Sequence, residues 1–414
     1  MNTSDNNLAY VAEIIKAKLE LRSSIPDLAV RFRTITTSIE SQVEALVREK
    51  RLNMSSIPTV DFHRLPFVEA ETVRKIKERG AVIVRGVFEA SRVKRWNDEI
   101  TDYLCINEYE KKQIHKMAAN EYFRKRPNAR PQFVSIYWSK PQMEARQSRE
   151  LAVTRRFLNS LWDTRQYDGH AFNPDRECTY ADRIRLRKPG DGSAGLPPHV
   201  DGGSIERWID PTYRKMYGDI FYGDVLQYDP FAGAHRADTK EILAPAVCSM
   251  FRTYQGWIAL TEQGPGDGTL KVAPIANAMA WILLRSLQND VQEPDLCGAI
   301  AGRGIVLSDA HHGLLLRGYN TIPRVDAGDT IWWHPDVVHG VEDVHGGNRD
   351  SSVMYIGSAP ECEKNSAFLA KQRVAFEAGR SSPDFYPDDF EVDFVNRFVT
   401  SDLSDLGRMQ MGYA

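Results

Sequence analysis

The sequence predicts a mainly β core, a sandwich or barrel, with helical additions at both ends of the chain. From about Cys178 to Pro360, short β-rich runs alternate with Gly and Pro turns, and many short strands at close spacing are typical of sandwiches and barrels. Near both ends of the chain, apolar residues instead recur at three- and four-residue steps, which is the helical period.

The first half of the chain is expected to form two segments that pack on the core. Residues 1–55 form a helical N-terminal extension, because apolar residues in NLAYVAEIIKAKLELR and from Ser38 to Arg51 fall on one helical face. The alternative is a helix that binds a partner or mediates a homodimer. Residues 56–177 form an α/β lead-in, in which AVIVRGVF is a buried strand and Glu89 to Ile100 a helix.

The second half holds the predicted core and a tail. Residues 178–360 contain the β-rich runs RIRLRK, RTYQGWIAL, TLKVAPI, DTIWWHP and SSVMYIGSAP. Residues 361–414 form a C-terminal helical tail that begins with KNSAFLAKQRVAFEAG. Because no repeat or low-complexity linker separates these segments, we expect one compact domain overall.

Composition narrows the classes of partner. The 414 residues carry a formal net charge of −3 with a pI near 6.4, so nucleic acid and anionic membrane are not expected partners. Five cysteines without a CxxC motif indicate reduced thiols, and MNTSDNNLAY lacks the pattern of a signal peptide. The most apolar stretch, AMAWILLRSL, is too short to span a bilayer. We therefore expect a cytoplasmic protein.

A histidine and an aspartate stand two positions apart in PPHVDGGSIERW. On a strand, His199 and Asp201 project from the same face, and Gly202 and Gly203 let the backbone turn away afterwards. An imidazole nitrogen beside a carboxylate oxygen supplies two ligands of a metal site. A simple hydrogen bond between the two side chains is the alternative.

A third ligand is expected from AGDTIWWHPDVVHGVEDVHGG. His339 is preferred, because it follows a Pro-Asp step and precedes Gly340, which permits close approach of the backbone to a ligand; His334 or His345 could take its place. Two histidines and one carboxylate on one face of an octahedron leave three positions open, as in non-haem Fe(II) oxygenases. Zinc favours a closed or nearly closed tetrahedral site instead.

These motifs, in this order, resemble a known enzyme superfamily. HVD, GWIALTEQGPGDGTLKVAPI and AGDTIWWHPDVVHG are similar to the core of Fe(II)/2-oxoglutarate-dependent oxygenases of the phytanoyl-CoA-dioxygenase-like branch. Within it, ADRIRLRKPG, CSMFRTYQGWIAL and WWHPDVVHGVEDV resemble a bacterial and fungal group, first described as a domain of unknown function, that includes an N-acetylglucosamine-induced fungal protein. The resemblance spans roughly residues 57–365.

The resemblance implies a fold, cofactors and a reaction. The fold is a double-stranded β-helix (jelly-roll, cupin-like) core, and the cofactors are Fe(II) and 2-oxoglutarate. With O2, such an enzyme hydroxylates a small-molecule substrate and forms succinate and CO2.

The resemblance also implies an arginine for the distal carboxylate of 2-oxoglutarate. In relatives it lies about ten residues beyond the distal histidine and is often followed by a serine or threonine two residues later, and Arg349 and Ser351 occupy these positions. Arg252 and Arg187 are the alternatives. Arg187 is the last arginine of RIRLRK, whose three arginines share one strand face. An inward-facing row requires an anion, whereas a row that faces water does not.

Substrate contacts are expected from two places, the long insertion between Gly203 and Lys240 and one face of RTYQGWIAL. The candidates are Arg207, Tyr213 and Tyr228 in the insertion, and Gln255 and Trp257 on the strand. Trp257 could instead fill the core. The arginines near the expected mouth favour an anionic substrate.

Two other functions remain open at this point. One is a cupin-like metal-dependent isomerase or hydrolase that uses Zn or Mn without 2-oxoglutarate. The other is a non-catalytic small-molecule-binding barrel, which an intact set of three metal ligands argues against.

Overall fold

The computed structural model describes residues 7–119, 132–166, 169–190, 195–245 and 247–413. Helices make up about 42% of it and strands about 17%, so the chain is mixed α/β with several sheets. This corrects the expectation of a mainly β protein. Much of the additional helix lies before residue 161, where most of the chain between the short strands is helical.

The elements are as follows. The helices are α1 (Val11–Ser24), α2 (Leu28–Arg51), α3 (Ala70–Arg79), α4 (Ala90–Ile106), α5 (Tyr109–Ala119), α7 (Lys140–Arg146), α8 (Arg149–Ser160), α9 (Glu206–Ile209), α10 (Pro211–Met216), α11 (Gly218–Phe221), α12 (Ala278–Arg285), α13 (Asp309–Leu316), α14 (Glu363–Ala378) and α15 (Asp405–Gln410). The strands are β1 (Thr59–Asp61), β2 (Ala81–Arg85), β3 (Phe133–Val134), β4 (Arg165–Gln166), β5 (Gly169–His170), β6 (Asn173–Glu177), β7 (Ile184–Arg187), β8 (Leu196–Val200), β9 (Tyr254–Ala259), β10 (Leu270–Ala273), β11 (Ile305–Val306), β12 (Asn320–Thr321), β13 (Thr330–Trp333), β14 (Val338–Val341), β15 (Ser351–Ser358) and β16 (Pro360–Glu361).

Two larger sheets form the centre of the molecule. One has seven strands in the order β1-β2-β13-β9-β15-β7-β3, and the other has five in the order β11-β8-β14-β10-β12. Apart from the parallel pair β1 and β2, the neighbours in both sheets are antiparallel. The strands β1, β2 and β3 precede residue 178, so the lead-in contributes directly to the larger sheet.

A buried apolar layer joins the two sheets. Trp257, Ile331 and Val353 of the seven-stranded sheet pack in one cluster with Leu270 and Val272 of the five-stranded sheet. Neighbouring residues along these strands, which point the opposite way, belong to other clusters. Each sheet is therefore apolar on both faces, which explains why a strand such as YQGWIA is buried at every position.

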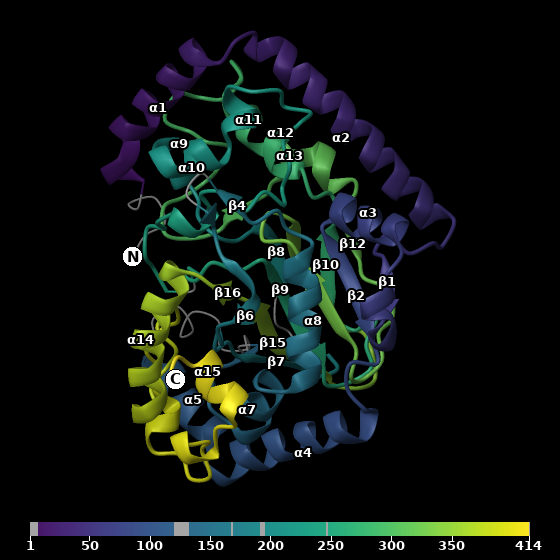
Figure 1. The fold of residues 1–414 in the computed structure, drawn as a ribbon, viewed down its shortest axis with the longest axis vertical. Helices are drawn as coiled ribbons and strands as arrows, with labels where there is room; N and C mark the ends of the chain where they lie inside the picture. Colours follow the sequence, from purple (N-terminus) through teal and green to yellow (C-terminus); the bar gives the residue numbers. More distant parts are fainter. Residues whose placement is uncertain (1–6, 120–131, 167–168, 191–194, 246, 414) are drawn as a thin grey trace.

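Helices cover the outer faces of the sheets. The outer face of the seven-stranded sheet packs with α4 and α8, and the outer face of the five-stranded sheet with α2, α9 and α12. Figure 1 shows α1 and α2 along one end of the molecule, α4 at the opposite end, and α14 with α15 beside the chain's C-terminus. The sheets therefore lie inside a helical shell.

A close contact holds the start of β2 beside the segment between β13 and β14, which leads to His339. Helix α3 ends at Gly80, which adopts φ of +61°, a left-handed conformation that favours glycine. A Cβ at this position would lie 2.7 Å from Cγ2 of Val337. The carbonyl of Gly80 accepts a hydrogen bond from the backbone N–H of His334.

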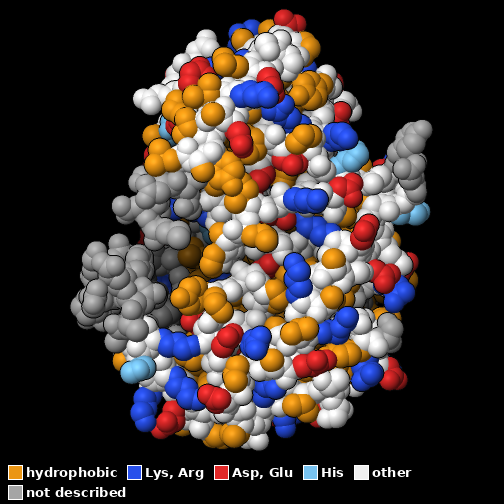
Figure 2. Space-filling view, turned by 90° about the vertical axis from the view of Figure 1, so that its left-hand side faces the viewer, with side chains coloured by type: hydrophobic (Ala, Val, Ile, Leu, Met, Phe, Trp, Pro, Cys, Tyr) orange, Lys and Arg blue, Asp and Glu red, His pale blue; other side chains and the backbone are white. Residues whose placement is uncertain are grey.

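On the face seen in Figure 2, Lys and Arg side chains are intermixed with Asp and Glu side chains. Among the described residues, no helix combines the length and the apolar character needed to cross a bilayer.

Candidate metal centre

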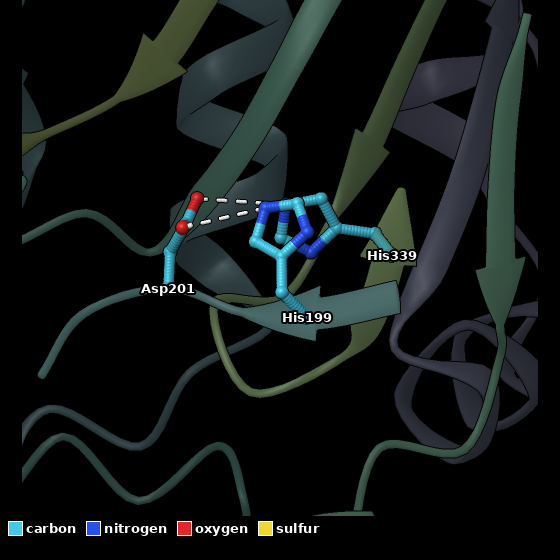
Figure 3. A group of neighbouring side chains, drawn as sticks. All are labelled: His199, Asp201 and His339. Carbon is cyan, nitrogen blue, oxygen red and sulfur yellow. Dashed lines mark ion pairs between the residues drawn. The ribbon is translucent and has the colours of Figure 1, made fainter. Parts of the chain in front are cut away.

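The five-stranded sheet brings the three predicted metal ligands together (Figure 3). His199 lies on β8, Asp201 directly follows that strand, and His339 lies on β14, where it pairs with His199 in the strand register. One ligand atom from each residue lies within 4.8 Å of the others. The Nε2 atoms of His199 and His339 are 3.6 and 3.4 Å from the Asp201 carboxylate. Ligands bound at about 2.1 Å to one ion lie about 3 Å apart, so this cluster needs little adjustment to hold one.

Backbone hydrogen bonds set the tautomer of both histidines. Nδ1 of His199 lies 2.8 Å from the carbonyl oxygen of Pro197, and Nδ1 of His339 lies 3.0 Å from that of Val337. A carbonyl can only accept, so each Nδ1 donates and each neutral ring directs the lone pair of Nε2 towards Asp201. Burial lowers the pKa of His199, which favours its neutral form.

This arrangement fits a divalent cation. Two nitrogen lone pairs that face one carboxylate repel it unless a positive charge lies between them. Burial opposes ionisation of Asp201, but His199 and His339 in their protonated forms, together with the positive charge of Arg252, outweigh burial and place the pKa of its carboxyl below the usual range. Asp201 is therefore ionised at neutral pH, as a metal ligand must be.

Glycines shape the backbone around the ligands. Gly202 and Gly203 have φ of +79° and +100°, so the chain turns sharply after Asp201 in a conformation that other residues rarely adopt. A Cβ at Gly340 would lie 2.6 Å from the carbonyl oxygen of Leu196. Gly340 therefore permits the close approach of β14 to β8, in place of the expected approach to a ligand.

Gln255 orients the Asp201 carboxylate from the opposite sheet. Its Nε2 donates to Oδ2 of Asp201 at 2.7 Å. Gln255 lies on β9 of the seven-stranded sheet, so this hydrogen bond connects the two sheets at the metal site. The residue predicted to contact substrate thus holds a ligand in place, although it also lines the cavity. Hydrogen bonds of this kind tune metal sites strongly.

A cavity of about 240 Å³ opens beside the three ligands. Its described lining combines apolar side chains with two arginines, Arg183 and Arg252, and one further carboxylate, Asp182. A larger surface cleft of about 1400 Å³ lies elsewhere, between the segment around Lys240 and helix α14, and contains none of the three ligands. We take the smaller cavity as the candidate site, because it contains the three candidate metal ligands.

Arg207 connects the two chain segments that carry the ligands. It donates to the carbonyl oxygens of Asp201 at 2.8 Å and Gly202 at 3.1 Å, and it pairs with Asp336 at 2.9 Å. Asp336 lies three residues before His339, so one guanidinium fixes both segments. Arg236 binds the other oxygen of Asp336 at 3.1 Å.

The field of these two arginines keeps the buried Asp336 ionised. Burial alone raises its pKa, but Arg236 and Arg207 outweigh burial, and the pKa of Asp336 lies well below its usual range. The three side chains are at most 7% exposed. We call Arg207, Arg236 and Asp336 the Asp336 cluster. It stabilises the two chain segments that carry the candidate metal ligands.

The other three candidates for substrate contact are also buried in the structure. Tyr213 donates to the carbonyl oxygen of Gly202 at 3.0 Å, and Tyr228 donates to Asp336 at 3.4 Å. Trp257 is fully buried in the apolar layer between the sheets. All three lie outside the lining of the 240 Å³ cavity, so we do not propose them as substrate contacts.

Arg349 lies on the surface, away from the ligands. Its side chain is 59% exposed and pairs with Glu262 at 2.9 Å. Ser351 is buried and donates to Oε1 of Gln263 at 3.1 Å. The spacing that selected Arg349 holds in the sequence, but the arginine precedes β15 and lies in the turn before it, so it does not share the strand's inward face.

Two buried arginines of β7 differ in how many of their N–H groups have a hydrogen-bond partner. Arg187 donates to the backbone carbonyls of Gly268, Glu342 and Asp343, so it is engaged in structural contacts. Arg185 faces the same way but reaches only Gln263, at 3.4 Å, and its Nε and Nη1 have no hydrogen-bond partner among the described residues. Burial lowers the pKa of Arg185.

His334 and His345, the alternative candidates for the third metal ligand, contact backbone carbonyls outside the candidate site. Nε2 of His334 bonds the carbonyl of Pro230 at 2.9 Å, and Nε2 of His345 bonds the carbonyl of Arg349 at 2.8 Å. Within the described chain, neither histidine belongs to the cluster of ligand atoms around Asp201.

Several residues of the site had no clear signal in the sequence. Asp336 stands in HPD, where nothing marks it as the partner of two arginines far away in the chain. Tyr355, Phe133 and Phe385 line the cavity from three distant segments. Arg185 was part of the recognised arginine row, and only its register opposite Val353 of β15 distinguishes it from its neighbours.

Proteins of known sequence and structure resemble this chain over nearly its whole length. The Gig2-like family matches residues 9–413. "Uncharacterized protein YbiU" of Escherichia coli (strain K12) is 39% identical over 99% of this chain and 98% of that protein. A crystal structure named "Putative Oxidoreductase" from Salmonella typhimurium LT2 is 38% identical with a TM-score of 0.91, covering 97% of both chains.

A fungal relative is more distant. GlcNAc Inducible Gene 2, GIG2, of Candida albicans is 25% identical with a TM-score of 0.82, over 96% of this chain and 88% of that chain. Together with the match over residues 9–413, these similarities show that the chain belongs to the Gig2-like family.

Proposed function

We propose that the protein is an Fe(II)- and 2-oxoglutarate-dependent oxygenase that acts on a small molecule. The observation that carries this proposal is the cluster of His199, Asp201 and His339, in which both histidines contact a backbone carbonyl through Nδ1 and direct Nε2 towards one carboxylate. Two histidines and a carboxylate are the ligands that non-haem Fe(II) oxygenases use, with the remaining positions open.

The route of the chain through the two sheets supports a double-stranded β-helix as the fold of the core. In sequence order, β7, β9, β13 and β15 belong to the seven-stranded sheet, and β8, β10, β12 and β14 to the five-stranded sheet. Eight antiparallel strands divided in this way between two packed sheets are typical of jelly rolls and cupins. In such a core the three ligands and the cavity lie between the sheets.

Fe(II) held by these ligands, together with 2-oxoglutarate, supplies O2-dependent oxidation of a substrate coupled to the formation of succinate and CO2. The chain's own residues prepare the site for this chemistry. Gln255 holds the Asp201 carboxylate, the carbonyls of Pro197 and Val337 hold the imidazole tautomers, and the apolar walls of the cavity limit access of water.

Arg185 is our candidate for binding the distal carboxylate of 2-oxoglutarate. It is fully buried, two of its nitrogen atoms lack partners among the described residues, and no described carboxylate pairs with it. A buried guanidinium without a counter-charge is costly, and a bound carboxylate would remove that cost. Arg185 is not itself part of the described lining of the cavity, but its guanidinium interacts electrostatically with Tyr355, which is.

The polar residues around Arg185 also suit the binding of a carboxylate. Gln263, which Arg185 contacts, also accepts hydrogen bonds from Thr269 at 2.7 Å and from Ser351 at 3.1 Å. Ser351 therefore remains near the proposed carboxylate site, whereas Arg185 replaces Arg349 as the proposed cation.

The oxygenase fits the protein better than a metal-dependent hydrolase, an isomerase or a non-catalytic barrel. The Salmonella relative carries the name "Putative Oxidoreductase", in agreement with a redox reaction. A metal-dependent hydrolase or isomerase without 2-oxoglutarate, or a non-catalytic barrel, gives no role to a buried arginine with open donors. We therefore prefer the oxygenase.

The proposal is tested by succinate formation from 2-oxoglutarate in the presence of Fe(II) and O2. We expect the wild-type protein to form succinate, and His199→Ala and Asp201→Ala to lose this activity while remaining folded. Arg74→Gln, a change at an exposed position of α3, is the control and should keep full activity. No succinate from the iron-loaded wild type, or full activity in either ligand variant, would contradict the proposal.

A further inference from the structure

Arg252 is a second buried arginine whose guanidinium forms no direct ion pair with a described carboxylate, although Asp201, Asp182 and Asp384 act on it electrostatically from a distance. It is 7% exposed, and among the described residues it forms neither a hydrogen bond nor an ion pair. It lines the cavity that contains His199, Asp201 and His339. An unpaired cation in this position is expected only if an anion binds next to it.

The residues around Arg252 hold its guanidinium in a position where it can bind an anion in the cavity. Its Cζ lies 5.1 Å from the ring centroid of Tyr180, whose hydroxyl donates to Asp384 at 2.9 Å. The stem of Arg252 passes over Gly357, where a Cβ would lie 3.2 Å from its Cδ. An aromatic platform below the guanidinium and a glycine beside the stem are typical of a pre-organised arginine.

The charges around the cavity indicate how many negative charges its ligand carries. Arg183 lies 3.5 Å from Asp182, so this pair is neutral overall. In the proposed holoenzyme, the ferrous ion, the Asp201 carboxylate, Arg185 and doubly charged 2-oxoglutarate also sum to zero. Arg252 adds one positive charge, part of which the buried carboxyl of Asp384 offsets electrostatically. The cavity can therefore neutralise at most one further negative charge, which matches a monoanion better than a phosphate ester with a charge near −2.

The size and lining of the cavity restrict the rest of the ligand. Its volume of about 240 Å³ is close to that of roughly eight water molecules in the liquid, and 2-oxoglutarate must share it. Beside the metal ligands its walls include the apolar side chains of Leu196, Leu270, Trp333 and Val341. A compact molecule with an apolar portion fits such a space.

From these observations we infer that the substrate is a small monocarboxylic acid whose carboxylate binds directly to Arg252. This inference rests on the proposed function, because the charge count includes Fe(II) and 2-oxoglutarate. It goes beyond that function by naming the chemical class of the substrate and the residue that selects it. The planar guanidinium offers two parallel donors, which a carboxylate accepts and a neutral amide cannot match.

The test compares two probes of nearly equal shape, butyrate and butyramide. Each is titrated calorimetrically into the protein loaded with Fe(II) and 2-oxoglutarate under anaerobic conditions, with propyl phosphate as a third probe. We expect butyrate to bind at least roughly tenfold more tightly than butyramide, because hydrogen bonds to charged groups contribute about 1.5–3 kcal/mol. Equal affinities, undetectable binding of butyrate, or tighter binding of propyl phosphate would overturn the inference.

Variants assign the preference to Arg252. Arg252→Gln should abolish the preference for butyrate without changing the affinity for 2-oxoglutarate, and Arg74→Gln should leave both unchanged. If Arg252→Gln does not fold, Arg252→Lys replaces it, since it keeps the charge but loses the paired donors and should lose much of the preference. A preference that survives loss of Arg252, or a loss of 2-oxoglutarate binding in its variants, would overturn the assignment.

The same titrations separate this inference from the proposed function. If wild-type protein does not bind 2-oxoglutarate in the presence of Fe(II), the proposed function itself is wrong. If 2-oxoglutarate binds and butyrate is not preferred, only the assignment of Arg252 and of the substrate class is wrong.

Discussion

Gln255 lies in the seven-stranded sheet, yet its amide reaches the carboxylate of Asp201, which follows a strand of the other sheet. The amide N–H group binds Oδ2 of Asp201, the oxygen that lies 3.4 Å from Nε2 of His339, and leaves Oδ1 to face Nε2 of His199 at 3.6 Å. The same side chain joins the metal site to the far wall of the cavity.

We therefore predict that Gln255→Leu lowers the affinity for Fe(II) by about tenfold to a hundredfold while the fold is retained, as is common when a partner of a metal ligand is lost. Calorimetric titration with the metal measures this effect. Gln292→Leu, at an exposed position, is the matched control and should bind metal as the wild type does. An unchanged affinity in Gln255→Leu would show that the hydrogen bond has no role in metal binding.

Arg185 and Arg187 give a sharper comparison, because they are neighbours on one strand face and both are fully buried. Without 2-oxoglutarate, Arg185→Met should raise the free energy of unfolding by about 1–4 kcal/mol, since it removes a buried charge that has no counter-charge. The same variant should bind 2-oxoglutarate roughly tenfold to a hundredfold more weakly. Urea unfolding and 2-oxoglutarate titration measure the two effects.

Arg187→Met is the matched control for that prediction. It should destabilise the protein by more than about 2 kcal/mol, because three backbone carbonyls lose their donor. If Arg185→Met destabilises the protein to the same extent, then Arg185 has a structural role like that of Arg187.

At the residue scale, the sequence could predict the three candidate ligands but not their surroundings. His199, Asp201 and Gly202 lie within four positions, so strand periodicity alone places the two side chains on one face. The environment of an arginine depends instead on partners from distant strands. Arg349 fitted the spacing and lies on the surface, whereas Arg185 is distinguished only by its burial and register.

At the scale of elements, the Asp336 cluster joins the turn after β8 to the segment that leads into β14. We predict that Asp336→Asn lowers the free energy of unfolding by about 3–5 kcal/mol, because it leaves two buried arginines without a counter-charge. The affinity for Fe(II) should also fall, since both ligand-bearing segments lose their common support.

Urea unfolding and metal titration check this prediction, with Asp224→Asn in an exposed turn as the control. A variant that loses stability but binds metal as tightly as the wild type would show that the Asp336 cluster stabilises the fold without positioning the ligands.

The segment Phe390–Val392 packs against α4 and against the residues that lead into α7. Glu391 accepts hydrogen bonds from the backbone of Tyr137 and Trp138 and from the hydroxyl of Tyr103. Burial is the largest effect on it and raises its pKa from 4.5 to about 7, despite these hydrogen bonds. The folded protein therefore holds a proton that the unfolded chain releases between these pH values.

This proton contributes its full share to the free energy of unfolding below about pH 4.5. The contribution falls as the pH rises and is lost above about pH 7, a decrease of about 3 kcal/mol in the free energy of unfolding. Glu391→Gln cannot titrate, so its stability relative to the wild type should increase by that amount between pH 4 and pH 8. Urea unfolding at the two pH values measures the difference, with exposed Glu13→Gln as the control. A constant difference would contradict the prediction.

The elements show where sequence periodicity was sufficient. The strands β2, β7, β9, β10, β13 and β15 lie within the runs that predicted them. The helices α1 and α14 extend one or two residues beyond their runs, and α2 begins at Leu28, well before the run that starts at Ser38. The short helices α9, α10 and α11 of the insertion were not predicted, because segments of four to six residues contain too few turns for a periodic signal.

At the scale of the whole molecule, the predicted balance between helix and strand was wrong, and strands from the lead-in join the larger sheet beside those between residues 178 and 360. The strands occupy few residues because each is short, and the helices around them are long. Pairing between distant strands, such as β13 with β2 and β9, brings the lead-in into the core sheet. Local patterns do not encode such long-range pairing.

The central claim is that His199, Asp201 and His339 hold one ferrous ion to which 2-oxoglutarate can bind. Anaerobic titration with Fe(II) in the presence of 2-oxoglutarate tests it most directly, because the chelate has a visible charge-transfer absorption. We predict that this absorption saturates at one iron per chain in the wild type and is absent from His339→Ala. Iron binding without the absorption in the wild type, or an equal absorption in His339→Ala, would contradict the claim.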